Sequence, residues 1–223
     1  ASNILDDRCQ RVKGGTFHFY CSQILHRYAD RIGYPNNFTI IDSADALEVI
    51  QFVRTKLNLH KKNKRFPNKN TLLKIISTAV NKHLDLRVVV MDQYPQFAES
   101  IDKIEDVALG YSEYKEKNFV MDFDDLLIKT KQLLEQHEDI RIKLASDHKF
   151  VMVDEYQDTN QLQADLTKLF SSVHKNVMAV GDDAQSIYSF RGADHQNIME
   201  FPDIFDNTTI IKLEENYRFF FFF

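Results

Sequence analysis

The hydrophobic residues of this chain follow a helical pattern over most of its length and a strand pattern near its end. Apolar positions recur at intervals of three and four residues, which predicts amphipathic α-helices. These helices are expected at residues 19–32, 43–57, 71–83, 96–117 and 123–136. Ser43 is expected to cap the second of them. Apolar runs typical of strands return only at Phe150, and the last expected strand is 209–213.

The strand pattern near the end of the chain forms a recognisable unit. An apolar run at 150–153 is followed by helical spacing at 161–171 and by a second apolar run at 176–180. Strands joined by a helix in this way lie parallel and side by side, so both end at the same edge of their sheet. The chain is therefore predicted to be an α/β protein that a mostly helical block interrupts.

Polar side chains follow both expected strands, at the edge where open α/β sheets bind ligands. Asp154 and Glu155 come directly after the first strand, and Gln185 comes shortly after the second. Asp154 could hold Mg²⁺ through water, and Glu155 could take a proton from a water that attacks a terminal phosphate. The amide of Gln185 could contact both the phosphate and that water.

Each of these residues also has a simpler explanation. An Asp-Glu pair after a strand usually begins a polar loop, and Gln185 by itself would more often be a buried structural amide. Their combination at two neighbouring strand ends, rather than any single residue, indicates nucleotide hydrolysis.

Five segments of the chain, taken in order, carry a family resemblance. They are Gly15-Thr16-Phe17-His18, Met121-Asp122-Phe123-Asp124-Asp125-Leu126-Leu127, Val153–Asn160, Val180–Asp194 and Leu213-Glu214-Glu215-Asn216-Tyr217-Arg218. The last three resemble helicase motifs II, III and IV of the UvrD/Rep family of superfamily 1 DNA helicases. The first two resemble its TFH motif and its DFDDLL helix start. Five ordered matches are far more specific than any one of them.

The resemblance implies a RecA-like P-loop NTPase fold, in which a parallel sheet carries helices on both faces. Residues 1–34 and 119–218 would belong to RecA-like domain 1A, and residues 35–118 would be the helical insertion, subdomain 1B. The five phenylalanines at 219–223 have no counterpart in the family. An exposed run of this kind would promote aggregation, so we expect an artefactual or disordered tail without function.

The resemblance also assigns roles in the use of ATP and Mg²⁺. It implies that Asp154 binds the metal, Glu155 is the general base and Gln185 senses the γ-phosphate. Arg218 would reach the γ-phosphate from across a cleft, and Tyr217 would stack on the adenine. Without the resemblance, Tyr217 and Arg218 would be an ordinary pair at a strand end, with Arg218 in a surface ion pair.

Further residues are candidates for contact with single-stranded DNA. Phe190 is the expected stacking residue, because an aromatic face stacks on any unpaired base. An aromatic residue after a strand is otherwise more often part of a core. His18 is expected to form hydrogen bonds rather than bind a metal, since no partner ligand has a suitable spacing. The full set that the resemblance implies is Thr16, Phe17, His18, Tyr188, Phe190 and Arg191.

Charge adds a second candidate DNA surface. The net charge of −5 does not suggest nucleic acid, but residues 49–84 hold nine Lys or Arg and no acidic residue. This block could neutralise phosphates and so bind DNA in a salt-dependent way, or it could be a solvated loop. The resemblance favours binding near duplex DNA. The central residues are Lys61, Lys62, Lys64 and Arg65.

Composition limits the class of protein. A chain of 223 residues with 43% hydrophobic and 27% charged residues is typical of a soluble protein of one or two domains. Its apolar runs are too short to span a membrane, and its first residues lack the features of a signal peptide. The two cysteines show neither metal spacing nor a disulfide framework, which favours the cytoplasm.

The resemblance implies an ATP-dependent DNA helicase that moves 3′–5′ on single-stranded DNA and unwinds duplex DNA. However, the loop G-x-x-x-x-G-K-[ST] is absent, because no two of the six glycines have the required separation. The family carries that loop upstream of this region and a second motor domain downstream, so we expect an inactive piece of a helicase. The alternatives are the motor part of a helicase-nuclease and a non-catalytic DNA-binding or interaction module.

Overall fold

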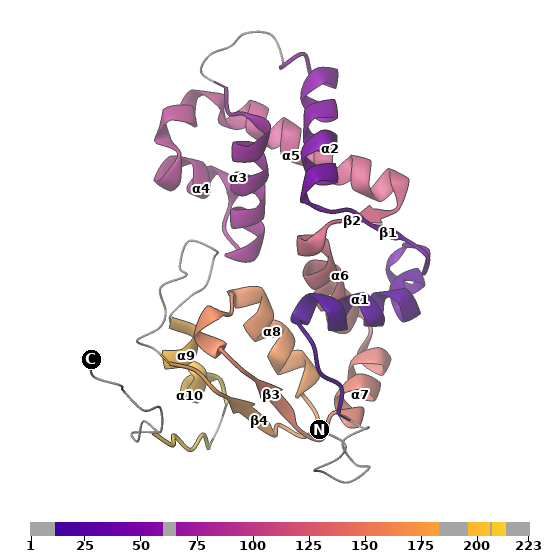
Figure 1. Cartoon of the computed structure of the whole chain (residues 1–223), viewed down its shortest axis with the longest axis vertical. Helices are drawn as coiled ribbons and strands as arrows, with labels where there is room; N and C mark the ends of the chain where they lie inside the picture. Colours follow the sequence, from indigo (N-terminus) through magenta and orange to yellow (C-terminus); the bar gives the residue numbers. More distant parts are fainter. Residues whose placement is uncertain (1–11, 60–65, 183–195, 206, 213–223) are drawn as a thin grey trace, which may run out of the picture.

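Helices make up most of the described chain. The computed structural model describes residues 12–59, 66–182, 196–205 and 207–212. Its helical segments are α1 (Phe17–Tyr28), η2 (Ala29–Ile32), α2 (Ser43–Lys56), α3 (Lys69–Asn81), α4 (Leu86–Gln93), η3 (Pro95–Ser100), α5 (Ile101–Asn118), α6 (Phe123–Gln136), α7 (Glu138–Asp147), η4 (Tyr156–Asp158), α8 (Gln161–Phe170), α9 (Gln196–Met199) and α10 (Phe201–Ile204). Figure 1 shows α2, α3, α4 and α5 in one group and α1, α6, α7 and α8 in another.

The helices expected from apolar spacing are confirmed, with differences at their ends. Asp42 rather than Ser43 caps α2, because its carboxylate accepts hydrogen bonds from the backbone N–H groups of Ala44 and Asp45. The expected helix at 96–117 begins as the separate 3₁₀ segment η3, which has Pro95 at its first position. The apolar spacing does not predict α4 or α7.

Two pairs of parallel strands lie in the described residues. β1 (Thr39–Ile40) pairs with β2 (Val120–Met121), and β3 (Val151–Val153) pairs with β4 (Val177–Ala179). Because α8 connects β3 to β4, the expected strand–helix–strand unit is confirmed. The expectation that strands return only at residue 150 is wrong, since β1 and β2 are strands that lie earlier in the chain.

The prediction of a strand at 209–213 is wrong for residues 209–212. These residues form no strand ladder with any other part of the described chain, and Leu213 lies outside it. Ile210 and Ile211 are exposed, at 69% and 79% of their surface. A β-branched run is therefore not sufficient for a strand where no neighbouring strand supplies hydrogen bonds.

The two groups of helices have separate hydrophobic cores. One cluster joins α1, α6, α7 and α8, and the other joins α2, α3, α4 and α5. Fully buried members of the first include Leu25, Leu127 and Leu133, and those of the second include Ile50, Leu72 and Ile104. Burial of each such side chain contributes about 1.5–3 kcal/mol, so both groups have their own source of stability.

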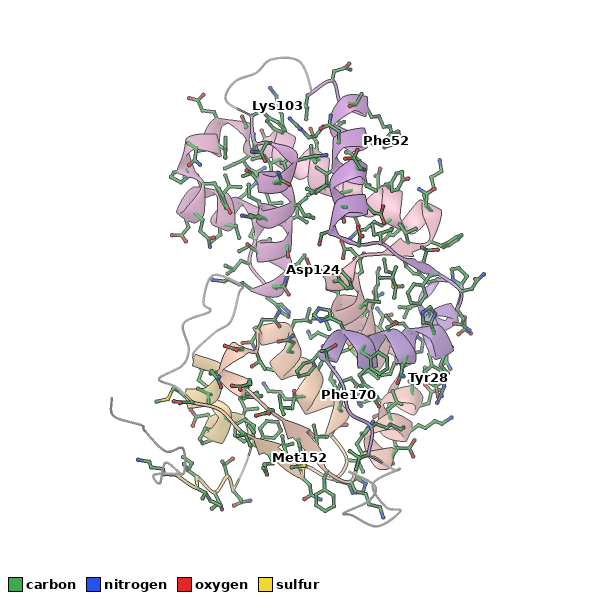
Figure 2. The ribbon with its side chains drawn as sticks, in the orientation of Figure 1. Tyr28, Phe52, Lys103, Asp124, Met152 and Phe170 are labelled. Atoms are coloured by element: carbon green, nitrogen blue, oxygen red, sulfur yellow. The ribbon has the colours of Figure 1, made fainter. Side chains whose placement is uncertain are left out.

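One face of the β3–β4 pair is open in the described residues. Val151 packs on the cluster that contains α8, whereas Met152 and Met178 are 69% and 49% exposed. Figure 2 shows Met152 on the side of the strands away from α8. The described helices therefore cover one face of this strand pair, although a sheet with helices on both faces was expected.

A buried ionic cluster joins α5 to the start of α6. The Lys115 Nζ lies 2.8 Å from the Asp122 Oδ2 and 2.7 Å from the Asp125 Oδ2. The Tyr111 hydroxyl donates a second hydrogen bond to the same Asp122 oxygen, at 2.7 Å. Asp122 and Asp125 also form a capping box that starts α6. This cluster fixes the connection between the two groups of helices.

None of the described helices has the length and apolar character needed to cross a membrane.

Candidate active site

The ends of β3 and β4 are held together by hydrogen bonds beyond the strands themselves. The Val180 backbone N–H donates to the Val153 carbonyl at 2.9 Å, and the Tyr156 N–H donates to the Val180 carbonyl at 2.9 Å. The loop after β3 therefore stays beside the loop after β4. This is the edge at which the sequence places the two carboxylates.

Asp154 and Glu155 both lie at this edge with exposed side chains. The Glu155 backbone N–H donates to the Asp154 Oδ1 at 3.0 Å. Glu155 has a φ of 50° in the left-handed region, which is rare for a residue with a side chain. Such a conformation persists only where the surroundings enforce it, and it is often found at functional positions.

A residue that the sequence did not single out, Gln157, connects these groups. Its Nε2 donates to the Glu155 Oε2 at 2.7 Å, and its Oε1 accepts from the Asp182 backbone N–H at 3.1 Å. Gln157 is 1% exposed. A Cβ at Gly181 would lie 2.5 Å from the Gln157 Oε1, so only glycine allows this close approach. Gln157 lies within the motif II resemblance, which was the only sequence signal for it.

Hydrogen bonds also connect the far end of the loop after β3 to α3 and α6. Asn160 caps α8, and its Nδ2 donates to the Asn81 Oδ1 at 2.7 Å. The Asn81 Nδ2 in turn donates to the Asp124 Oδ1 at 2.8 Å. Burial raises the pKa of Asp124, while hydrogen bonds from Ser77 and Asn81 oppose that shift. Figure 2 shows Asp124 at the junction between the two groups of helices.

A cavity of about 570 Å³ brings two of the predicted segments together. Asp154 and Glu155 contribute to its lining, and so do Thr16, Phe17 and His18. Carboxylate oxygens are the ligands that Mg²⁺ prefers, and a cavity of this size is typical of small-molecule sites. The two acids therefore fit a role at a metal–nucleotide complex.

The three residues of the TFH segment differ in their surroundings. Thr16 is exposed and caps α1, because its Oγ1 accepts a hydrogen bond from the Phe19 N–H at 3.2 Å. Phe17 is half-buried against the hydrophobic cluster of α1, α6, α7 and α8. The His18 ring contacts the edge of Phe123 at a centroid distance of 6.0 Å. Burial lowers the pKa of His18, and the nearby Asp124 carboxylate partly opposes this effect.

No group of three or more metal-binding side chains occurs within the described ranges. The remaining candidate residues all lie outside those ranges. They are Lys61, Lys62, Lys64, Arg65, Gln185, Tyr188, Phe190, Arg191, Tyr217 and Arg218. The five phenylalanines at 219–223 also lie outside.

The described part of the basic block has partners of its own. The Lys69 Nζ forms an ion pair with the Glu48 Oε1 at 2.6 Å. Arg54 lies over the Phe66 ring at 5.8 Å, and burial lowers its pKa. These two cations are therefore partly engaged within the chain.

Comparison with known proteins identifies the family of this chain. Residues 2–206 match the family described as UvrD/REP helicase N-terminal domain. The chain is 36% identical over 217 residues to the ATP-dependent DNA helicase PcrA of Staphylococcus aureus strain Mu50, which covers 96% of this chain and 29% of that protein. It is 36% identical over 218 residues to the PcrA of Staphylococcus epidermidis strain ATCC 12228, with 97% and 29% covered. The chain thus spans 29% of the length of these relatives, and it belongs to the UvrD/REP helicase family.

Proposed function

We propose that this chain is part of an ATP-dependent DNA helicase and carries the water-activating side of its nucleotide site. The observation that carries the proposal is the adjacent pair Asp154 and Glu155 at the joined ends of β3 and β4, facing a shared cavity. The two relatives named PcrA are ATP-dependent DNA helicases, which supports the same activity for the protein to which this chain belongs.

The roles of the two acids follow from their chemistry. Asp154 would hold Mg²⁺, whose bound ATP supplies the phosphoryl group that is transferred to water. Glu155 would accept a proton from the attacking water and orient it. Gln185, Tyr217 and Arg218 would complete the site, as the family resemblance implies for these positions.

The fold supports a division into a RecA-like domain and a helical insertion. The two hydrophobic clusters separate the residues of α2–α5 from those of α1 and α6–α8. We assign residues 35–118 to the insertion and residues 1–34 and 119–218 to the RecA-like domain. The whole protein would act in the cytoplasm, move 3′–5′ on single-stranded DNA and unwind duplex DNA.

DNA contact is assigned to two surfaces. Thr16, Phe17 and His18 would lie along single-stranded DNA with Tyr188, Phe190 and Arg191, and aromatic stacking would hold unpaired bases. Lys61, Lys62, Lys64 and Arg65 would contact duplex phosphates. In a salt titration of DNA binding by the isolated chain, affinity should fall steeply as salt rises. A flat response would contradict the phosphate contacts.

The catalytic assignment is tested by Glu155→Gln in the complete protein that contains this chain. DNA-stimulated ATP hydrolysis should fall about 10²- to 10⁴-fold, because the amide cannot act as a base, while ATP binding is retained. Glu138→Gln is the matched control, since Glu138 lies on α7 and forms a surface ion pair with Arg141. Unchanged turnover in Glu155→Gln would instead support a DNA-binding module without catalysis.

A further inference from the structure

Gln157 is a buried amide whose two ends serve two different loops. Its side chain is almost completely enclosed, with 1% of its surface exposed. One end contacts the carboxylate of Glu155, and the other contacts the backbone after β4. A buried amide with both ends paired holds its neighbours in one arrangement, because each lost hydrogen bond would leave a buried polar atom unsatisfied.

The orientation of this amide is fixed by its partners. The Asp182 backbone N–H can only donate, so the oxygen of Gln157 must face it. The Nε2 must then face Glu155, where the 2.7 Å distance to the Oε2 is short enough for a charge-assisted hydrogen bond. This occupies one oxygen of the Glu155 carboxylate and leaves the Oε1 as the oxygen that can accept a proton.

Glu155 needs such a restraint. Its side chain is exposed, so packing does not hold it, and its backbone is in the left-handed region. The side chain of Gln157 lies two residues further along the same loop and is itself held by burial. The hydrogen bond therefore restricts the motion of the exposed Glu155 carboxylate, because its donor Gln157 is buried and fixed.

We propose that Gln157 is a positioning residue for Glu155, and that it makes the orientation of this carboxylate depend on the loop after β4. The inference rests on the proposed role of Glu155 as the general base. In the sequence, Asp182 is followed by residues 183–195, which include Gln185 and Phe190. A shift of the Asp182 backbone would move the Gln157 side chain, and with it the carboxylate of Glu155.

Two substitutions separate positioning from simple structural support. Gln157→Glu keeps the size of the side chain and an oxygen for the Asp182 N–H, but it puts a carboxylate against that of Glu155. Gln157→Met keeps the size and removes both hydrogen bonds. In the complete protein, we expect either change to lower the kcat of DNA-stimulated ATP hydrolysis about 10- to 100-fold and to leave the KM for ATP nearly unchanged.

A comparison of kcat with KM separates positioning from structural support. A misplaced base lowers kcat while ATP still binds with its normal KM, whereas a loop that has lost its structure would also raise the KM for ATP, because Asp154 lies in the same loop. Gln161→Glu is the matched control, because it makes the same amide-to-carboxylate change where the amide donates to the Asp165 carboxylate at 3.3 Å within α8. It should leave the kcat unchanged.

A double substitution tests whether Gln157 acts through Glu155. In the Glu155→Gln background, Gln157→Met should cause no further loss of kcat, because there is no base left to position. An additional 10-fold loss would overturn the inference, and so would a normal kcat in both single variants at position 157. Full activity of Glu155→Gln would contradict the proposed function itself. It would therefore be distinguished from a result that contradicts only the positioning role of Gln157.

Protein that does not fold is excluded by a separate measurement. The unfolding midpoint and far-ultraviolet circular dichroism of each variant are compared with those of the Gln161→Glu control. If Gln157→Met fails to fold, Gln157→Glu still decides the question, because a folded Gln157→Glu variant with a normal kcat contradicts the inference.

Discussion

Replacement of Lys115 by methionine would test how the two helical groups are joined. Lys115 is 7% exposed, and its Nζ is shared by the carboxylates of Asp122 and Asp125. Methionine has a similar length and fills the same space without the charge. Because the substitution leaves two buried carboxylates without their cation, we expect the free energy of unfolding to fall by about 3–5 kcal/mol at pH 8.

The loss should depend on pH, because the carboxylates can bind protons. Burial raises the pKa of Asp125 to about 6 even though Lys115 opposes that shift. For Asp122, burial alone would raise the pKa, but attraction to Lys115 lowers it overall. Without Lys115, the pKa values of both groups rise above those of the unfolded chain, where Asp titrates near its ordinary value.

The sign of the effect follows from linkage. Where the folded state binds more protons than the unfolded state, stability increases as pH falls. The variant should therefore recover about 1.4 kcal/mol per pH unit for each proton taken up, until the unfolded carboxylates also bind protons near pH 4. Between pH 8 and pH 5 the difference from the original protein should shrink by about 2–3 kcal/mol.

Urea unfolding of the isolated chain, followed by circular dichroism at pH 8 and pH 5, would measure this difference. Lys69→Met is the control, because Lys69 pairs with Glu48, whose side chain is 72% exposed, and loss of that pair should cost less than about 1 kcal/mol at either pH. An equal loss for Lys115→Met at both pH values, or a loss no larger than that of the control, would refute the reasoning.

Three further predictions concern the loop after β3 and the residues that contact it. Gly181→Ala should lower the free energy of unfolding by about 1–3 kcal/mol in urea titrations, because its Cβ would lie 2.5 Å from the Gln157 Oε1. Glu155→Gly should be about 1 kcal/mol more stable than Glu155→Ala, because both lose the hydrogen bond from Gln157 and only glycine relieves the left-handed strain. Asn81→Ala should cost about 1–3 kcal/mol, because it removes hydrogen bonds to Asp124 and Asn160; a loss below 0.5 kcal/mol would contradict a joining role.

The sequence was sufficient to predict the fold where several local signals agree with each other. The strand–helix–strand unit from β3 to β4 has two apolar runs with a helical period between them, and the structure adds Asn160 as the cap of the helix. Parallel pairing follows from that order alone, so the position of Asp154 and Glu155 at a shared edge was predictable. The comparisons with known proteins confirm the family that the motifs indicate.

The sequence was not sufficient to predict strands whose pairing partners lie far away along the chain. β1 and β2 have two residues each, so neither has a periodic pattern, and the register pairs Thr39 with Val120. The opposite error occurs at 209–212, where Ile210 and Ile211 suggest a strand but no described strand pairs with them. In both cases the pairing partner, rather than the local composition, decides the outcome.

The candidate site shows the same limit in its supporting residues. Asp154 and Glu155 could be found from their place after an apolar run, but their exposed side chains gain little rigidity from packing. Gln157 holds Glu155 to the loop after β4, and Asn160 holds the far end of the same loop to Asn81 in α3. The loop is therefore fixed at one end to the neighbouring strand and at the other to the helical block of α2–α5. A change in either neighbour would reach the carboxylates through side-chain amides, and contacts of this kind become visible only once the chain is folded.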